Sequence, residues 1–155
     1  MKILVMSDSH YRENYVYEIM KKNTDADLVI HLGDGEDDMM NGFREIPAFG
    51  NKRLIRVKGN CDTGSALPEC SFDTICGIRF MSTHGYRERV KQGLYVLYAE
   101  ARQYERQVAL FGHTHVQFYE EMNGVHLFNP GAAQDMHYGI INIDEKTGQL
   151  EFLHF

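Results

Sequence analysis

The sequence contains few cysteines and no long apolar run. Its three cysteines, Cys61, Cys70 and Cys76, are odd in number and lack zinc-finger spacing, which favours free thiols in a reducing compartment over a disulfide framework. No apolar stretch approaches the roughly 18 residues that a membrane-spanning helix needs. Polar residues also follow the first apolar run too soon for a signal peptide. We therefore expect a cytoplasmic protein that does not associate with membranes.

The chain also lacks an excess of basic residues. Sixteen Lys and Arg residues against 22 Asp and Glu residues give a formal net charge of −6 at pH 7, so no duplex nucleic acid is expected as a partner. The P-loop, the dinucleotide-binding Gly-x-Gly-x-x-Gly, the Gly-x-Ser-x-Gly of serine hydrolases and the His-Glu-x-x-His of zincins are all absent. These four classes of enzyme therefore lose their usual sequence support.

The length and hydrophobic content of the chain are sufficient for one hydrophobic core. A chain of 155 residues with 43% hydrophobic content predicts a single domain over 1–155. Apolar and helical spacing then predict an alternation of elements. Strands are expected at 2–7, 28–32, 53–57 and 108–111, and helices at 14–22, 90–104 and, with a break near Gly42, Glu36–Glu45.

Turn residues in the second half predict hairpins. Gly77 separates the apolar stretches 72–75 and 78–82, and the pair Asn123-Gly124 is a strong signal for a two-residue turn. A terminal hairpin is expected around 146–148. Together these patterns predict an α/β fold in which two packed β-sheets are flanked by helices.

Polar side chains follow nearly every predicted strand. They are carboxylates, amides and imidazoles: Asp8 and His10, Asp34, Asn60 and Asp62, His84, and His113 and His115. Each pattern alone is more often turn chemistry or a loop histidine. Their recurrence at five strand ends, however, indicates one shared edge of the sheet, and in extended geometry Asp8 and His10 would point to the same face.

Such a cluster of carboxylates is unfavourable without cations, because like charges at short distance resist joint ionisation. Asp, Asn and His ligands without thiolate favour manganese, with zinc, iron, nickel or magnesium as alternatives, over copper or an iron–sulfur cluster. The set is too large for one catalytic ion. The sequence therefore predicts two divalent metal ions per chain.

Five short motifs occur in order between residue 4 and about residue 132: Asp8-x-His10, Gly33-Asp34, Gly59-Asn60-x-Asp62, Thr83-His84-Gly85, and Gly112-His113-Thr114-His115 followed by Asn129-Pro130-Gly131. Together they resemble the calcineurin-like metallophosphoesterases, and most closely their small bacterial and archaeal phosphodiesterase branch. The resemblance implies a sandwich of two mixed β-sheets between helices. It also implies hydrolysis of a phosphodiester by a hydroxide that bridges the two metal ions.

The resemblance further implies two ligand sets that share one carboxylate: Asp8, His10 and His115 for one ion, Asn60, His84 and His113 for the other, and Asp34 between them. Asn60, His84 and Asp62 form the expected catalytic set. In this hypothesis Asp62 does not bind metal but orients a ligand histidine through the second nitrogen of its ring.

Several residues near the motifs bear on the substrate. Cys61 stands where many relatives have a histidine that protonates the leaving oxygen, and a neutral thiol is a weak donor, which favours aryl or nucleotide leaving groups. Tyr11, Tyr86 and Ala132 also depart from the family pattern and change only the polarity of the pocket. Three arginines could clamp a phosphate: Arg12, Arg87 and Arg89.

The remaining histidines are expected outside the site. His31 is expected to be a core residue whose ring nitrogens are hydrogen-bonded. His126, His137 and His154 have no other possible ligand at a suitable spacing in the sequence. The predicted partner is a small phosphoester, possibly a nucleotide, and a homodimer is plausible. Two alternatives stay open: a phosphomonoesterase, and a non-enzymatic protein-interaction scaffold of the same fold. The competent side chains at all seven ligand positions favour the enzyme.

Overall fold

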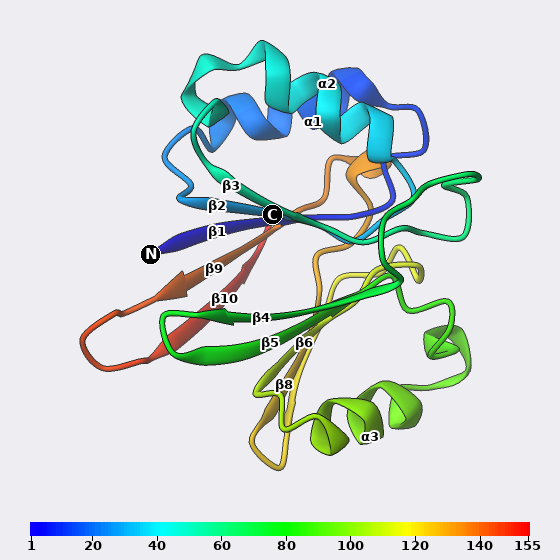
Figure 1. Ribbon diagram of the computed structural model, residues 1–155, viewed down its shortest axis with the longest axis vertical. Helices are drawn as coiled ribbons and strands as arrows, with labels where there is room; N and C mark the ends of the chain where they lie inside the picture. The colour runs from blue at the N-terminus through cyan, green and yellow to red at the C-terminus, as the bar shows by residue number, and fades with distance from the viewer.

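The computed structural model describes residues 1–155 and contains two five-stranded β-sheets with helices on their outer faces (Figure 1). The strands are β1 (Lys2–Met6), β2 (Leu28–His31), β3 (Arg53–Arg56), β4 (Cys70–Ile75), β5 (Ile78–Thr83), β6 (Val108–Leu110), β7 (Phe118–Met122), β8 (Val125–Asn129), β9 (Gly139–Ile143) and β10 (Leu150–His154). The helices are α1 (Glu13–Lys22), α2 (Glu36–Glu45) and α3 (Tyr95–Gln103), with short 3₁₀ turns η1 (Pro47–Phe49), η2 (Val90–Gln92) and η3 (Ala133–Asp135).

Both sheets are mixed. The first has the order β10-β9-β1-β2-β3, in which β1, β2 and β3 are parallel, β9 runs antiparallel to β1, and β10 runs antiparallel to β9. The second has the order β4-β5-β6-β8-β7, with β5, β6 and β8 parallel and an antiparallel strand at each edge. This arrangement confirms the predicted α/β fold with two packed mixed sheets flanked by helices.

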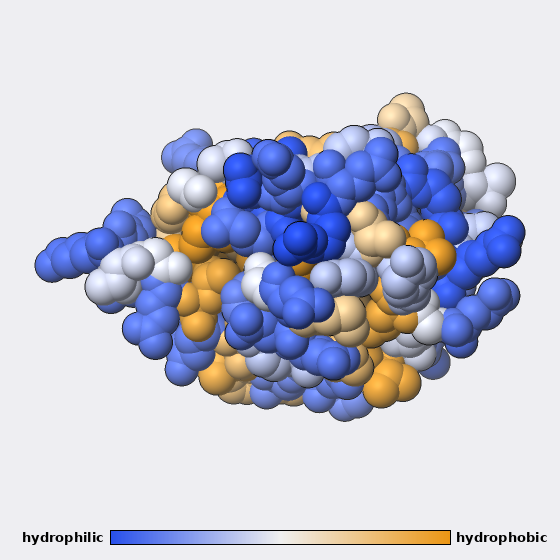
Figure 2. Space-filling view, turned by 90° about the horizontal axis from the view of Figure 1, so that it is seen from below, coloured by the Kyte–Doolittle hydropathy of each residue, from blue (hydrophilic) through white to orange (hydrophobic).

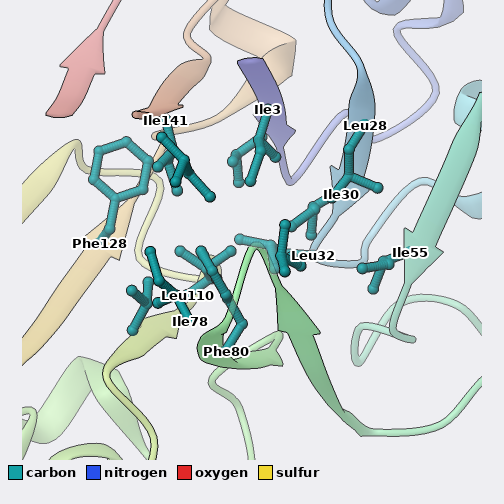
Figure 3. Close-up of a cluster of buried hydrophobic side chains, with 14 of the residues drawn as sticks. Ile3, Leu28, Ile30, Leu32, Ile55, Ile78, Phe80, Leu110, Phe128 and Ile141 are labelled. Carbon is teal, nitrogen blue, oxygen red and sulfur yellow. The ribbon is translucent and has the colours of Figure 1, made fainter. Parts of the chain in front are cut away.

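Alternation along the strands divides the apolar side chains between layers. Ile3 and Val5 of β1 point into the core between the two sheets, whereas Leu4 and Met6 point to the layer beneath α1 and α2. Figure 3 shows the central layer, where Phe128 and other side chains of the second sheet face those of the first. Each fully buried aliphatic or aromatic side chain contributes about 1.5–3 kcal/mol. On the far side, α3 covers the second sheet.

The helix predicted over 90–104 is wrong in its first third. Val90–Gln92 form a single 3₁₀ turn, and Gly93 interrupts the chain with a φ of 131° before α3 begins. The predicted break at Gly42 is also wrong, because α2 is continuous there. A Cβ on Gly42 would lie 3.0 Å from the sulfur of Met20, so glycine allows α1 and α2 to approach closely.

The three predicted hairpins are confirmed, including the terminal one, in which β9 and β10 pair antiparallel on either side of the turn at 146–148. Gly77 lies in the turn between β4 and β5, and Asn123 and Gly124, with φ values of 48° and 78°, connect β7 and β8. The parallel strands β1, β2 and β3 all end at one side of the first sheet, at the right in Figure 1. None of the helices is long and apolar enough to cross a membrane.

Candidate metal centre

The loops that follow the strands have an unusual backbone conformation, with positive φ angles at several predicted ligands. Five predicted ligands have a left-handed conformation, with φ between 42° and 65°: Asp8, His10, Asp34, His113 and His115. The extended geometry predicted for Asp8 and His10 is therefore wrong. Instead, the N–H groups of Asp8 and His10 donate to the carbonyls of Gly33 and Asp34, at 2.9 and 3.1 Å. These bonds across the sheet edge hold a conformation that costs about 1–3 kcal/mol per residue, and such strain concentrates at functional sites.

Asp8 is fully buried, and only one of its oxygens is satisfied. Its Oδ2 accepts hydrogen bonds from the Ser7 hydroxyl at 2.6 Å and from the main-chain N–H of His113 at 2.9 Å. Its Oδ1 has no hydrogen-bond partner and lies 3.2 Å from Nε2 of His115 and 3.7 Å from Nε2 of His10. A buried carboxylate oxygen without a partner is costly, and a cation between it and the two imidazoles would satisfy it.

Asp34 lies between two groups of donors. Its Oδ2 is 3.3 Å from Nε2 of His84 and 3.8 Å from Nε2 of His10, while its Oδ1 accepts the main-chain N–H of Cys61 at 2.7 Å. Asn60 completes this side, because its Oδ1 is 3.1 Å from the same His84 nitrogen. Asp34 is thus the carboxylate that both groups share.

The backbone fixes the ring of His84. Its Nδ1 lies 2.8 Å from the carbonyl oxygen of Leu32, so the proton on this nitrogen is donated to the carbonyl and Nε2 faces Asp34. The ring of His113 packs against that of His84 with centroids 5.0 Å apart. This tautomer presents the Nε2 lone pair to the centre, as metal ligation requires.

These contacts also shift the pKa values of Asp34 and His84. Burial by itself would raise the pKa of Asp34, but the hydrogen bond and charge of His84 lower it below its usual value. Burial likewise opposes the charged form of His84, yet the carboxylates of Asp34 and Asp8 raise the pKa of this ring. The centre therefore favours positive charge next to its carboxylates, whether a proton or a metal ion supplies it.

Two residues to which the sequence analysis assigns no role hold the loop of His113 and His115. The side-chain amide of Gln134 lies 3.1 Å from Nδ1 of His115 and orients that ring. The buried amide of Asn129 donates to the carbonyl of Gly112 at 2.9 Å and to the Thr114 hydroxyl at 3.0 Å. The Asn-Pro-Gly motif marked Asn129 as notable, whereas no local signal marks Gln134.

Possible metal ligands form three overlapping clusters, one of which comprises His10, Asp34 and the thiol of Cys61. Donor atoms of Asp8, His10 and His115 lie within 4.8 Å of one another, and those of Asp34, His84 and His113 do the same. The seven predicted ligands thus come together at one end of the two sheets. Carboxylate, amide and imidazole donors suit a divalent ion such as manganese or zinc. With the unsatisfied oxygen of Asp8, this donor set fits metal ions.

The role predicted for Asp62 is wrong, because no hydrogen bond joins it to a histidine. Its carboxylate instead accepts four main-chain N–H groups, those of Asp34, Gly35, Glu36 and Gly59, at 2.7–3.2 Å. Asp62 therefore holds the loops after β2 and β3 together. The wrong prediction arose because sequence spacing does not reveal which groups face a side chain.

Other predictions near the centre have mixed outcomes. Arg87 is paired with Glu88 and Glu100, so its guanidinium is not free to clamp a phosphate, while Arg12 and Arg89 are exposed. His31 is buried, as predicted, but satisfied at one nitrogen only. Its Nδ1 accepts the N–H of Gly33 at 3.3 Å, its Nε2 has no partner, and burial lowers its pKa to about 4.

Comparisons with known proteins show which family this chain is similar to. Residues 1–146 match the family model of the calcineurin-like phosphoesterase superfamily domain. The probable metallophosphoesterase YsnB of Bacillus subtilis is 29% identical over 159 residues, which cover 98% of this chain and 90% of that protein. A phosphodiesterase of Methanocaldococcus jannaschii is 27% identical over 150 residues, which cover 84% of this chain and 83% of that protein.

Solved structures share the fold. A conserved protein of Streptococcus pneumoniae, described as a predicted phosphoesterase, has a TM-score of 0.77 at 22% identity and covers 99% of this chain and 97% of its own. Vps29 of Entamoeba histolytica, complexed with zinc, has a TM-score of 0.76 at 18% identity, covering 100% of this chain and 98% of its own. From its sequence motifs, its two-sheet architecture and the match over 1–146, this chain belongs to the calcineurin-like phosphoesterase superfamily.

Proposed function

We propose that the protein is a phosphodiesterase that uses two divalent metal ions. Asp8, His10 and His115 would hold one ion, Asn60, His84 and His113 the other, and Asp34 would contact both. The observation that carries this proposal is the buried Oδ1 of Asp8, which has no hydrogen-bond partner and faces two imidazole nitrogens. Manganese is the favoured metal, since all seven donors are oxygen or nitrogen.

When bound, the ions would supply positive charge that polarises phosphoryl oxygens and lowers the pKa of water toward neutrality. The protein's own residues prepare the centre for this chemistry. His84 keeps its proton on Nδ1 through Leu32, and the amide of Cys61 orients Asp34. Asp8 is held by Ser7 and by the N–H of His113, so its free oxygen points inward.

Cys61 limits the choice of leaving group. Burial and the neighbouring Asp34 raise the pKa of its thiol, so the thiol stays neutral near pH 7. A neutral thiol is neither a strong nucleophile nor a strong proton donor. The site therefore suits diesters whose leaving group departs without protonation, such as aryl or nucleotide esters.

A hydrolysis assay with added metal tests this function. Purified protein is treated with a chelator, dialysed, and supplied with manganese. We expect hydrolysis of bis(4-nitrophenyl) phosphate to exceed that of 4-nitrophenyl phosphate and to disappear after chelation. His84→Asn should lose the activity, whereas His126→Asn, which alters a histidine that contacts Tyr119, should retain it.

The two alternatives have distinct outcomes in the same assay. Faster hydrolysis of the monoester would indicate a phosphomonoesterase. Absence of turnover on both esters, with metal shown to be bound, would favour a protein-interaction scaffold, and structural neighbours named Vps29 make this alternative worth testing.

A further inference from the structure

One of the three clusters of possible metal ligands contains a sulfur atom. The Sγ of Cys61, a carboxylate oxygen of Asp34 and a ring nitrogen of His10 lie within 4.8 Å of one another. Nε2 of His10 is 3.8 Å from Oδ2 of Asp34. Two ligands of one tetrahedral zinc ion lie about 3.3–3.8 Å apart, because the bonds to oxygen, nitrogen and sulfur are about 2.0–2.3 Å long. The three donors therefore already approach the spacing that one ion requires.

The backbone holds the thiol beside the carboxylate. The main-chain N–H of Cys61 donates to Oδ1 of Asp34 at 2.7 Å, and Oδ2 of Asp34 faces His10. The carboxylate of Asp62 accepts the N–H groups of both Asp34 and Gly59, which lie in the two loops that carry these donors. The loop that carries Cys61 is therefore fixed against Asp34 by the protein alone.

The sulfur-containing cluster is open to solvent. Its three residues line a cavity of about 430 Å³, and Cys61 is exposed. The wall also carries Glu36 and Asp37 and contains no Lys or Arg, so the cavity attracts cations. Hydrophilic side chains also cover much of the face that carries α3, which Figure 2 shows, so polar surface alone does not mark a metal site. The three convergent donors distinguish the cavity from such a surface.

This cluster shares His10 with the candidate metal centre. Nε2 of His10 lies 3.3 Å from Nε2 of His115 and 3.7 Å from Oδ1 of Asp8, which is buried and has no hydrogen-bond partner. A cation at this nitrogen is therefore also attracted by the unsatisfied oxygen. Since the nitrogen has one lone pair, it binds one ion at a time, and the two positions of that ion exclude each other.

Sulfur selects between metal ions. A thiolate is a soft ligand that favours ions such as zinc, whereas manganese prefers oxygen and nitrogen. A thiol that is neutral in the free protein loses its proton when it binds such an ion. The Sγ of Cys61 would therefore strengthen the binding of zinc and add nothing to the binding of manganese.

We propose that Cys61, His10 and Asp34 form a site for a thiophilic divalent cation, of the class of zinc and cadmium. The ion bonds to the thiolate sulfur, to Nε2 of His10 and to Oδ2 of Asp34, and the thiol proton passes to solvent. Because the ion takes two ligands from the manganese pair, it displaces manganese from the centre. This site needs no catalytic activity, so it does not depend on the phosphodiesterase function proposed above.

Absorption by bound cobalt tests whether the thiolate is a ligand. Cobalt(II) accepts the same ligands as zinc, and a bond from thiolate to cobalt gives a charge-transfer band in the near ultraviolet. We expect chelator-treated wild-type protein to develop this band when cobalt is added and to lose it when zinc follows. Cys61→Ser should lack the band, although serine keeps the main-chain N–H that Asp34 accepts. Cys76→Ser is the matched control, because Cys76 is also exposed but lies in the turn between β4 and β5.

Histidine variants test which other residues bind the same ion. His10→Asn should weaken the cobalt band, whereas His113→Asn should retain it, because His113 belongs only to the cluster of Asp34 and His84. The site is overturned if the wild type shows no band or if the band survives Cys61→Ser. A band that His113→Asn removes as completely as His10→Asn overturns the assignment of the three ligands.

The affinities for zinc and manganese, measured by calorimetry, test the selectivity. Cys61→Ser should lower the affinity for zinc at least about tenfold, a loss that is usual even for residues that only support a metal ligand. The affinity for manganese should change less than about twofold, because manganese does not favour sulfur. Equal losses for both metals contradict the proposal. A protein that binds zinc through Cys61 but hydrolyses neither ester upholds the site and rejects the phosphodiesterase.

Discussion

The carboxylate of Asp62 accepts a hydrogen bond from the main-chain N–H of Asp34, at a distance of 2.8 Å. The same carboxylate accepts the N–H groups of Gly35, Glu36 and Gly59. Burial would raise the pKa of Asp62, but these four hydrogen bonds lower it. One ionised side chain thus fixes the backbone on both sides of the carboxylate that would contact both metal ions.

Asp62→Asn is expected to weaken the fold and the metal centre together. The amide has one acceptor oxygen, and its NH₂ group would face backbone donors, so the metal-free protein should lose about 2 kcal/mol in the free energy of unfolding. Affinity for manganese should fall about tenfold. Urea unfolding and calorimetric titration measure these two changes.

Asp37→Asn is the matched control for this variant. Asp37 lies in the first turn of α2, next to Glu36, and is exposed, so its replacement removes the same charge without breaking a hydrogen bond. An Asp62→Asn protein that unfolds at the wild-type urea concentration would show that the four bonds do not matter.

Gly59→Ala should disrupt the centre through sterics. A Cβ at Gly59 would collide with Oδ1 and the main-chain nitrogen of Asp34. The loops cannot both stay in place, and we expect a loss of more than about 3 kcal/mol in the free energy of unfolding. Gly50→Ala is the control, because a Cβ there meets only the carbonyl of Pro47, at 3.4 Å. Equal melting temperatures for the two variants would contradict the close approach of these loops.

Metal binding should release a proton near neutral pH. The carboxylates of Asp34 and Asp8 raise the pKa of His84 against the effect of burial, so a proton competes with metal for this ring. Affinity for manganese is therefore expected to fall as the pH drops through the pKa of this ring, which lies above its ordinary value of 6.5. Calorimetry in two buffers of different ionisation enthalpy measures the released protons. Identical heats in both buffers would contradict the competition.

His31 should make the metal-free protein sensitive to mild acid. Burial lowers its pKa to about 4 from an ordinary value of 6.5, so the unfolded chain takes up a proton before the folded one does. Its contribution to stability is complete above pH 6.5 and is lost as the pH falls toward 4, which amounts to about 2 kcal/mol between pH 7 and pH 5.

His31→Asn isolates this contribution. Asparagine offers an oxygen near the position of Nδ1, which accepts the N–H of Gly33, and it does not titrate. The free energy of unfolding of this variant, measured with chelator present, should change less between pH 7 and pH 5 than that of the wild type. Parallel profiles for the two proteins would exclude His31 as the source of the acid sensitivity.

The sequence predicts what depends on neighbouring residues. Apolar runs and turn residues identified the strands around Asp34 and the hairpin at Gly77, because the pattern of buried residues and the backbone preference of a turn depend on residues that are adjacent in the sequence. The left-handed conformation of His10 could not be predicted, since a hydrogen bond to Asp34 maintains it. Similarly, the contact of Gln134 with His115 depends on how η3 packs beside the loop after β6.

The most direct test of the proposed pair of metal ions is the number of manganese ions that the chain binds at saturation, measured by equilibrium dialysis and elemental analysis. We expect two ions per wild-type chain, close enough for their spins to couple in an electron paramagnetic resonance spectrum. We expect Asp34→Asn to weaken binding of both. A single ion at saturation, or two ions held by Asp34→Asn with wild-type affinity, would contradict a pair of metal ions joined by Asp34.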